Sequence, residues 1–119
     1  MKIDILTLFP EMFTPLFSSI LKRAQQNNLI EINVINFRDY SCDKHSKVDD
    51  VPFGGGDGMV LMCQPIFDCI NSIKTPNSKI IYMSPKGKTL NQTNVKEYVN
   101  YEHIIILCGH YEGVDQRVI

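Results

Sequence analysis

Residues 3–37 decide the fold and read IDILTLFPEMFTPLFSSILKRAQQNNLIEINVINF. The first of these residues, up to Pro10, are apolar except for Asp4 and Thr7. A short apolar run that stops at a proline is typical of a buried strand, because proline cannot donate to a strand ladder. This stretch therefore predicts that the chain opens with a strand.

Apolar residues recur at helical spacing over residues 12–24, which predicts an amphipathic helix. Thr14 followed by Pro15 predicts an N-cap with proline in the first turn, so we expect the regular helix to begin there, after a looser turn over residues 10–13. Residues 30–37 alternate apolar and polar side chains and predict a second strand. Strand, helix and strand in this order predict the opening of a parallel sheet.

The rest of the chain continues this alternation. Short helices are predicted over residues 65–73 and 93–98, and strands over residues 79–83 and 104–108. The predicted fold class is therefore α/β, with a parallel sheet flanked by helices in one domain.

The glycines gather at three places along the chain. Four lie in residues 54–58, Gly87 follows one predicted strand, and the last two follow another. Because ligands bind beyond the carboxyl ends of the strands in such sheets, we expect the loops over residues 84–87 and 109–113 to form one site. Glycine lets a ligand approach the main chain closely, so this site should consist largely of backbone.

Two other interpretations of the glycines are weaker. Residues 54–58 do not follow a strand and lack the G-x-G-x-x-G spacing of dinucleotide-binding loops, so a flexible linker is the simpler alternative there. Residues 87–89 (GKT) resemble the end of a phosphate-binding loop, but Tyr82 stands where its first glycine would be needed. A plain turn with solvated lysines is the alternative at that position.

Residues 38–58 have no apolar period and collect charges, Pro52 and glycines, which predicts a long loop. Loops of that length are uncommon in compact domains and are usually functional or disordered, and we favour a functional loop. Asp49 and Asp50 are adjacent, so in an extended stretch they would point to opposite sides and form no carboxylate pair. The basic residues of the loop are suited to phosphate contacts or to a solvated rim: Arg38, Lys44, His45 and Lys47.

The composition of the 119 residues is that of an ordinary globular protein, with a formal net charge of −1. This charge gives no global argument for a nucleic-acid partner, which would have to bind a local patch. The cysteines form no C-x-x-C pair and no histidine lies at zinc-finger spacing, so neither a zinc site nor a disulfide framework is predicted. The first apolar run is too short for a signal peptide or a membrane span, and we expect a cytoplasmic protein with no membrane partner.

The titratable side chains give few signs of catalysis. His103 and His110 have no partner visible in the sequence. Glu112 stands between Tyr111 and Gly113 in a predicted loop and is the better candidate for a functional carboxylate.

Five blocks of sequence stand in order along nearly the whole chain. They are LFPEMF at residues 8–13, DKH at 43–45 with VDD at 48–50, PFGGGDGM at 52–59, SPKG at 84–87 and CGHYEGVDQRV at 108–118. Taken together, these blocks closely resemble the bacterial tRNA (guanine-N1)-methyltransferase family, TrmD. The order and number of the blocks make this resemblance highly specific.

The resemblance implies a SPOUT-type fold with a deep trefoil knot, a homodimer, and S-adenosylmethionine bound among the knot loops. Residues 1–119 would form the N-terminal part of the SPOUT methyltransferase domain, truncated before the knot is complete and lacking the C-terminal tRNA-binding domain. The implied cofactor contacts are Tyr82, Met83, Ser84, Pro85, Gly87, Gly109, Tyr111 and Gly113.

The reaction implied by the resemblance transfers a methyl group to N1 of the guanine immediately 3′ of the tRNA anticodon, and magnesium takes part in catalysis. Glu112 would have a supporting role, either opposing the positive charge of the cofactor or helping to organise magnesium, and no residue is assigned as a metal ligand. The family's general base, an aspartate, lies beyond residue 119. Lys44, His45 and Asp50 are the implied RNA contacts.

We therefore expect this chain by itself to be an inactive fragment of a tRNA methyltransferase. Val114, Val118 and Ile119 begin a helical apolar stripe that no cap, glycine or polar linker closes. The alternative is a non-catalytic RNA- or nucleotide-binding module that keeps the loops without the chemistry. The reading frame beyond Ile119 would separate these two possibilities.

Overall fold

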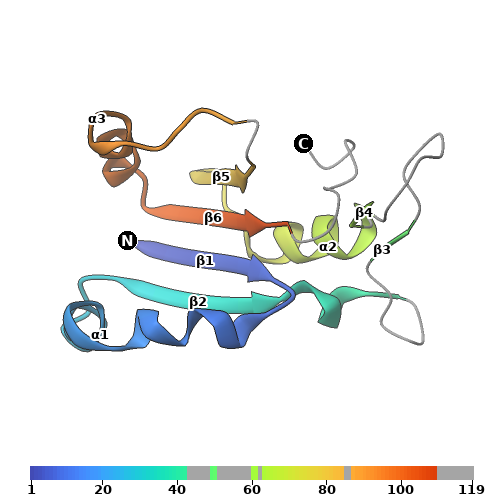
Figure 1. Cartoon of the computed structure of the whole chain (residues 1–119), viewed down its shortest axis with the longest axis horizontal. Coiled ribbons are helices and arrows are strands. Elements are labelled where there is room, and N and C mark those ends of the chain that lie inside the picture. Colours follow the sequence, from blue (N-terminus) through green and yellow to red (C-terminus); the bar gives the residue numbers. More distant parts are fainter. Residues whose placement is uncertain (43–48, 51–59, 62, 85–86, 110–119) are drawn as a thin grey trace.

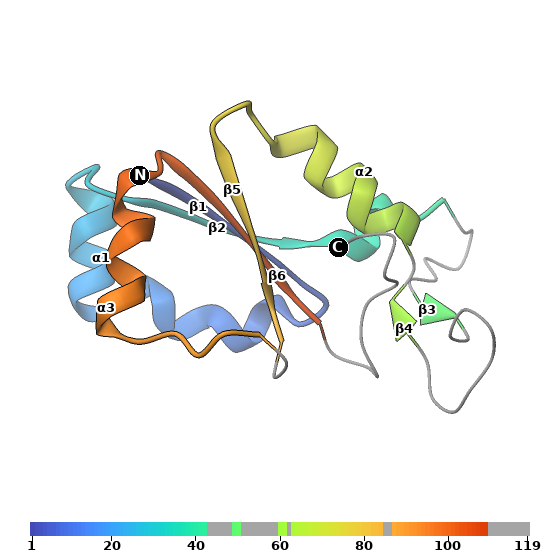
Figure 2. The same cartoon turned by 90° about the horizontal axis from the view of Figure 1, so that it is seen from above.

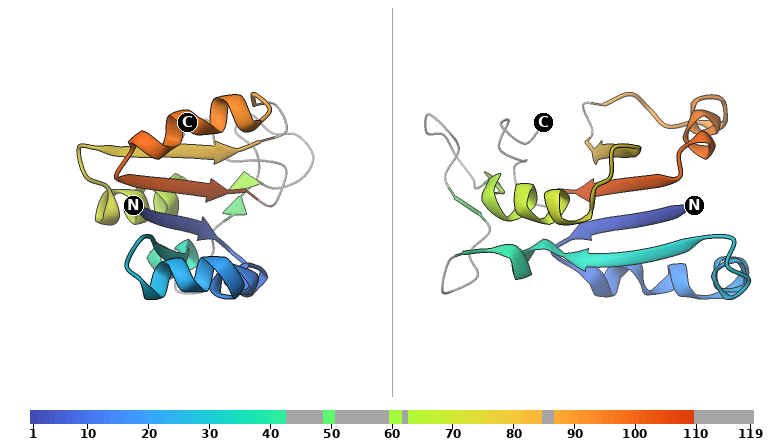
Figure 3. Two further views of the ribbon diagram at one scale, coloured as in Figure 1. Left: turned by 90° about the vertical axis from the view of Figure 1, so that its left-hand side faces the viewer. Right: turned by 180° about the vertical axis from the view of Figure 1, so that it is seen from behind.

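A four-stranded parallel sheet forms the centre of the molecule (Figure 1). The computed structural model describes residues 1–42, 49–50, 60–61, 63–84 and 87–109. The strands are β1 (Lys2–Thr7), β2 (Glu31–Asn36), β5 (Ser78–Met83) and β6 (His103–Cys108). Their order across the sheet is β2-β1-β6-β5, which is visible from behind in Figure 3. The predicted α/β class and all four predicted strands are confirmed.

The helices lie on both faces of this sheet. Figure 2 shows α2 (Cys63–Ile73) on one side, and α1 (Ser19–Gln26) and α3 (Gln92–Val95) on the other. The connections β1 to β2 and β5 to β6 cross the sheet in the same direction, whereas β2 to β5 crosses in the opposite direction. Because parallel crossovers are almost always right-handed, this strand order places α2 opposite the other two helices.

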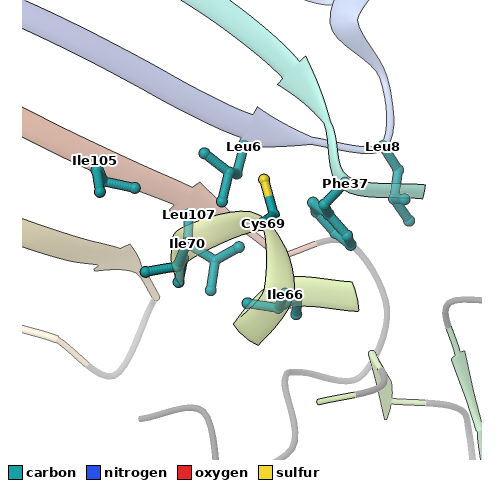
Figure 4. Close-up of a cluster of buried hydrophobic side chains, with 8 residues drawn as sticks. All are labelled: Leu6, Leu8, Phe37, Ile66, Cys69, Ile70, Ile105 and Leu107. Atoms are coloured by element: carbon teal, nitrogen blue, oxygen red, sulfur yellow. The ribbon is translucent and has the colours of Figure 1, made fainter. Parts of the chain in front are cut away.

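The core lies between α2 and the two central strands (Figure 4). Side chains alternate between the faces of a strand, so Leu6 of β1 and Ile105 and Leu107 of β6 point towards α2. They meet Ile66 and Cys69 of that helix, and all five side chains are almost fully buried. The cluster is completed by Leu8, Phe37 and Ile70.

The prediction that the regular helix begins at Thr14 was wrong. A 3-10 helix, η1, spans Pro10–Phe17, and α1 begins only at Ser19. The hydroxyl of Thr14 donates backwards to the carbonyl of Glu11 at 2.9 Å, so it caps no helix. Ser18 is extended and separates the two helices, and Ser19, the first residue of α1, has a φ of 56°, in the left-handed region.

The structure adds short elements to the predicted loop that starts at residue 38, and it divides the helix predicted over residues 93–98. The predicted loop from residue 38 begins with a 3-10 turn, η2 (Phe37–Tyr40), and includes the short strand β3 (Asp49–Asp50), which pairs antiparallel with β4 (Val60–Leu61). The helix predicted over residues 93–98 consists of α3 followed by a 3-10 turn, η3 (Lys96–Asn100). Among the described residues, no helix has the length and apolarity needed to cross a membrane.

A polar network joins the amino-terminal halves of all four strands of this sheet. Asp4 of β1 and His103 of β6 are almost fully buried, and Oδ2 of Asp4 lies 2.6 Å from Nε2 of His103. Nδ1 of His103 lies 2.6 Å from the hydroxyl of Ser78, the first residue of β5. Asn33 of β2 donates to the other carboxylate oxygen of Asp4 at 3.0 Å. The network therefore crosses the whole sheet and gives His103 a partner that the sequence did not reveal.

Candidate functional site

The carboxyl ends of β5 and β6 lie side by side at one edge of the sheet. The two strands pair in parallel, with Met83 opposite Cys108. Ser84 and Gly109, the first residues after these strands, therefore leave the sheet at neighbouring positions. The structure thus brings together the starts of the two loops that were expected to form one site.

The loop after β5 turns sharply at once. The backbone N–H of Gly87 donates to the carbonyl of Ser84 at 3.1 Å. A Cβ added at Gly87 would lie 3.4 Å from that carbonyl oxygen, which is ordinary van der Waals contact. The turn itself would therefore accept a side chain at this position, and its packing does not require glycine.

The side chains at these strand ends differ in exposure. Tyr82 packs against the hydrophobic core, whereas the side chain of Met83 is 51% exposed and Gly109 is exposed. Burial raises the pKa of the half-buried Cys108 thiol above its ordinary value of 9.0. Because the thiolate is the nucleophilic form, Cys108 stays protonated and unreactive near neutral pH. The described part of this edge is therefore formed by backbone, apolar surface and a neutral thiol.

The described residues contain five of the eight expected cofactor contacts: Tyr82, Met83, Ser84, Gly87 and Gly109. Pro85, Tyr111 and Gly113 lie outside the described residues, as does Glu112. Of the expected RNA contacts, Lys44 and His45 also lie outside the described residues. Asp50 is placed through its backbone, opposite Val60 in the pairing of β3 with β4.

Sequence reasoning missed Gln64, which lies in the first turn of α2. Its Nε2 atom donates to the carbonyl of Tyr40 and to a carboxylate oxygen of Asp68, each at 2.6 Å. Its Oε1 atom accepts the backbone N–H of Cys42 at 3.1 Å. The available signal was a polar residue directly before Pro65, two positions after the apolar run 59–62. Gln64 thereby joins the segment that leaves η2 to the start of α2.

Main-chain groups are available to a ligand where β5 and β6 end. Two neighbouring backbone segments leave the sheet there, and Gly87, whose N–H closes the turn after β5, is exposed to solvent. Among the residues that the structure describes, no group of three or more histidine, cysteine, aspartate or glutamate side chains could hold a metal ion. No magnesium ligand is therefore assigned to the described residues.

The whole chain, residues 1–119, matches the family model described as tRNA (Guanine-1)-methyltransferase TrmD. Among curated proteins, it is 58% identical to the tRNA (guanine-N(1)-)-methyltransferase of Ruminiclostridium cellulolyticum, over all of this chain and 53% of that protein. It is 52% identical to the protein of the same name from Malacoplasma penetrans, with the same coverage. The corresponding protein of Macrococcus caseolyticus is 53% identical over 99% of this chain and 50% of its own length. The chain thus spans about half the length of these relatives.

Proposed function

The chain belongs to the tRNA (guanine-1)-methyltransferase TrmD family, and from this premise we propose that a family-length protein carrying it methylates tRNA. The proposed product carries the methyl group on N1 of the guanine immediately 3′ of the anticodon. The observation that supports this most strongly is the family match over residues 1–119. Residues 1–119 would supply the N-terminal part of a SPOUT methyltransferase domain in a cytoplasmic homodimer.

The proposed cofactor site is the edge where β5 and β6 end. S-adenosylmethionine would supply a methyl group on a sulfonium, which is open to displacement in line with the sulfur. The residues proposed to hold it are the last two of β5 and those of the two loops: Tyr82, Met83, Ser84, Pro85, Gly87, Gly109, Tyr111 and Gly113. Met83 and Cys108, the last residues of the two strands, are paired, so the loops that follow them begin side by side. This supports the assignment.

The chemical contribution of this chain would be binding and orientation. Backbone N–H and C=O groups beyond the strand ends can hydrogen-bond an adenine edge without side-chain bulk. Holding the methyl group in line with the attacking nitrogen removes much of the entropic cost of bringing the reactants together. Glu112 would oppose the positive charge of the cofactor or help to organise magnesium, and the base that deprotonates N1 would come from beyond residue 119.

The proposed RNA contacts are Lys44, His45 and Asp50. The net charge of −1 supports a local rather than a global attraction, because the chain as a whole does not attract phosphates. The basic side chains of Lys44 and His45 would contact the phosphate backbone, which positions the RNA without reading its sequence.

Methyl transfer to tRNA transcripts tests the proposed function. The family-length protein would be incubated with labelled S-adenosylmethionine and an unmodified transcript, and the product nucleoside identified by mass spectrometry. We expect 1-methylguanosine at the position 3′ of the anticodon, and no transfer to a transcript with adenine there. Binding of cofactor and tRNA without any transfer would instead indicate the non-catalytic binding module.

A further inference from the structure

An open pocket of about 440 Å³ lies where β5 and β6 begin. Two turns form it. Before β5, the backbone N–H of Ser78 donates to the carbonyl of Thr75 at 3.1 Å, and before β6, that of Tyr101 donates to the carbonyl of Tyr98 at 3.2 Å. The volume falls in the range of pockets that hold small organic ligands. The lining residues are Pro76, Asn77, Ser78, Asn100, Tyr101 and Glu102.

This pocket and the proposed cofactor site lie at opposite ends of the same two strands (Figure 1). Ser78 is opposite His103 where the strands begin, and Met83 is opposite Cys108 where they end. The five residue steps between these pairs, at about 3.3 Å each, separate them by about 17 Å. A small ligand in the pocket therefore does not reach the loops after β5 and β6, and the pocket is a separate site.

Two side-chain amides of the pocket are available to a ligand. Asn77 and Asn100 are exposed, and neither amide is hydrogen-bonded within the part of the chain that the structure describes. Each amide offers two donors and one acceptor, and the edges of nucleobases carry donors and acceptors side by side. Among the lining residues Glu102 alone is charged, and its carboxylate disfavours a phosphate or another anion inside the pocket.

The wall at Ser78 is fixed in place before any ligand binds. The hydroxyl of Ser78 accepts the backbone N–H of Thr75 at 2.8 Å and lies 2.6 Å from Nδ1 of His103. His103 is buried and bonded in turn to Asp4 of β1, so this wall is attached to the centre of the sheet. A pocket that is formed in advance saves a ligand the cost of ordering it.

An aromatic ring and ammonium groups complete the surroundings. Nζ of Lys79 lies 5.8 Å from the centroid of the half-buried Tyr101 ring. The exposed Lys74 directly precedes the turn that leads into β5. Bases of single-stranded RNA stack on aromatic side chains, and lysines contact the phosphates of the same strand. Neutral amides and a ring in the pocket, with lysines beside it, thus match a nucleotide whose base lies inside and whose phosphate lies outside.

We propose that this pocket receives an unpaired nucleotide of RNA. Asn77 and Asn100 hydrogen-bond the base, Tyr101 stacks on it, and Lys79 contacts the phosphate. The inference goes beyond the proposed function, whose RNA contacts are Lys44, His45 and Asp50, and rests on it only in taking the RNA to be tRNA. A free nucleotide offers the same chemistry, so the experiment separates these two sources.

Three substitutions in the family-length protein test the pocket. Asn77→Ala and Asn100→Ala each remove one amide at an exposed position, and neither asparagine has the positive φ that alanine would resist. Tyr101→Leu keeps an apolar side chain and removes the ring. Asn71→Ala is the matched control, because Asn71 is an exposed asparagine of α2 that does not line the pocket.

The readouts are the Kd values for unmodified tRNA, for guanosine and adenosine 5′-monophosphates and for S-adenosylmethionine, together with the melting temperature. We expect each asparagine variant to weaken tRNA binding roughly three- to tenfold, the effect of losing one hydrogen bond. Tyr101→Leu should weaken it at least roughly fivefold, through lost stacking. The affinity for S-adenosylmethionine should stay at the wild-type value in every variant, as should the melting temperature of the asparagine variants, and Asn71→Ala should change none of these readouts.

A direct contact is tested by cross-linking the wild-type protein to tRNA with ultraviolet light. Peptides that contain Tyr101 should carry a nucleotide, a result that a purely structural role of the ring does not produce. Absence of such a peptide, together with unchanged tRNA affinity in all three variants, would overturn the inference and leave the proposed function standing.

Two further outcomes separate the sources of the nucleotide and the two proposals. Binding of a nucleoside monophosphate that is lost in Asn77→Ala, with unchanged tRNA affinity, would show a site for a free nucleotide and overturn the assignment to RNA. Binding of tRNA that depends on Asn77 and Tyr101, without any methyl transfer by the wild-type protein, would support the inference and overturn the proposed function.

Discussion

His103 and Asp4 are 99 residues apart in sequence and form a buried pair, with Nε2 of the imidazole 2.6 Å from Oδ2 of the carboxylate. The pair joins the first strand of the sheet to the last one described. Each partner makes a further hydrogen bond, to Ser78 and Asn33 respectively, so the polar atoms of the pair are fully engaged within the sheet.

Replacing one member of this pair should destabilise the fold strongly. Asp4→Ala leaves the ring nitrogen Nε2 of the buried His103 without its partner, whereas the amide of Asn33 keeps its hydrogen bond to Glu31. Leaving a buried polar group without its hydrogen-bond partner costs about 1–3 kcal/mol. Lys2→Met is the matched control, because Lys2 and Glu31 form an exposed pair at 3.8 Å, worth at most about 1 kcal/mol. Urea denaturation measures both, and a cost below about 1 kcal/mol for Asp4→Ala would contradict the importance of the network.

Stability should fall at alkaline pH because of Cys69. Burial, followed by the negative charge of Asp4, raises the pKa of the Cys69 thiol from 9.0 to about 11. Below pH 9 the thiol is protonated in the folded and the unfolded chain, whereas between about pH 9 and pH 11 only the unfolded chain loses the proton. The free energy of unfolding should therefore decrease as the pH rises through this window, by an amount of order 2 kcal/mol.

Urea denaturation from pH 7.5 to pH 11 tests this pH dependence. Cys69→Ala should show a shallower alkaline loss than the wild type, whereas Cys42→Ala, at an exposed thiol, should show the full loss. Identical pH profiles for wild type and Cys69→Ala would contradict the prediction.

Gly109→Val should weaken binding of S-adenosylmethionine by the family-length protein at least tenfold. A branched side chain at the exposed end of β6 would occupy the space in which the cofactor is proposed to approach the backbone. Glu102→Val serves as the control, since Glu102 is exposed at the opposite end of the same strand. Calorimetry showing unchanged cofactor affinity in Gly109→Val would remove this loop from the site.

Asp50→Ala should lower methylation of tRNA without loss of stability. Asp50 is held by backbone pairing with Val60, which alanine preserves, so we expect the melting temperature to stay nearly unchanged. We expect kcat/KM for tRNA to fall at least tenfold. Asp49→Ala is the neighbouring control, because it makes the same change at the adjacent residue of β3. A large drop in melting temperature with normal turnover would reverse the assignment.

The 119-residue chain alone should show no measurable methyl transfer. The chain spans 53% of its Ruminiclostridium cellulolyticum relative, and the family's general base is expected beyond residue 119. General-base assistance is worth roughly a hundredfold to ten-thousandfold, and a partial cofactor site would reduce the rate further. The assay compares this chain with the family-length protein on unmodified tRNA, and turnover within a few-fold of the longer protein would show that a base within residues 1–119 was overlooked.

The strands could be predicted from sequence because they are short apolar or alternating runs, and the two central strands, β1 and β6, are largely buried. Residues 104–108 illustrate this, since three of the five, Ile104, Ile105 and Leu107, are buried in the centre of the sheet. The start of α1 could not be predicted, because it depends on the left-handed backbone at Ser19 and on the hydrogen bond from Ser18 to Pro15. Both are local departures from the helical pattern, and the apolar spacing continues through them.

The site was predictable where it follows from topology and hidden where it depends on pairing between distant residues. The adjacency of the loops after β5 and β6 follows from the rule for parallel sheets, and Met83 and Cys108 confirm it at the backbone. Asp4 with His103 and Gln64 with Tyr40 and Cys42 are side-chain pairings across 99, 24 and 22 residues. The apolar period of a single helix or strand carries no information about side chains that pair across such separations in sequence.

The position of β1 also determines when the sheet can be completed during synthesis. β1 is made first, yet one of its two neighbours is β6, with Lys2 opposite His103. The ribosome must therefore deliver about a hundred residues before the centre of the sheet can close, and contacts of such separation are slow to form. Until then β1 has β2 as its only neighbour within this sheet, and its other edge stays open to pairing with foreign strands. The nascent chain is thus most vulnerable to aggregation shortly before β6 emerges.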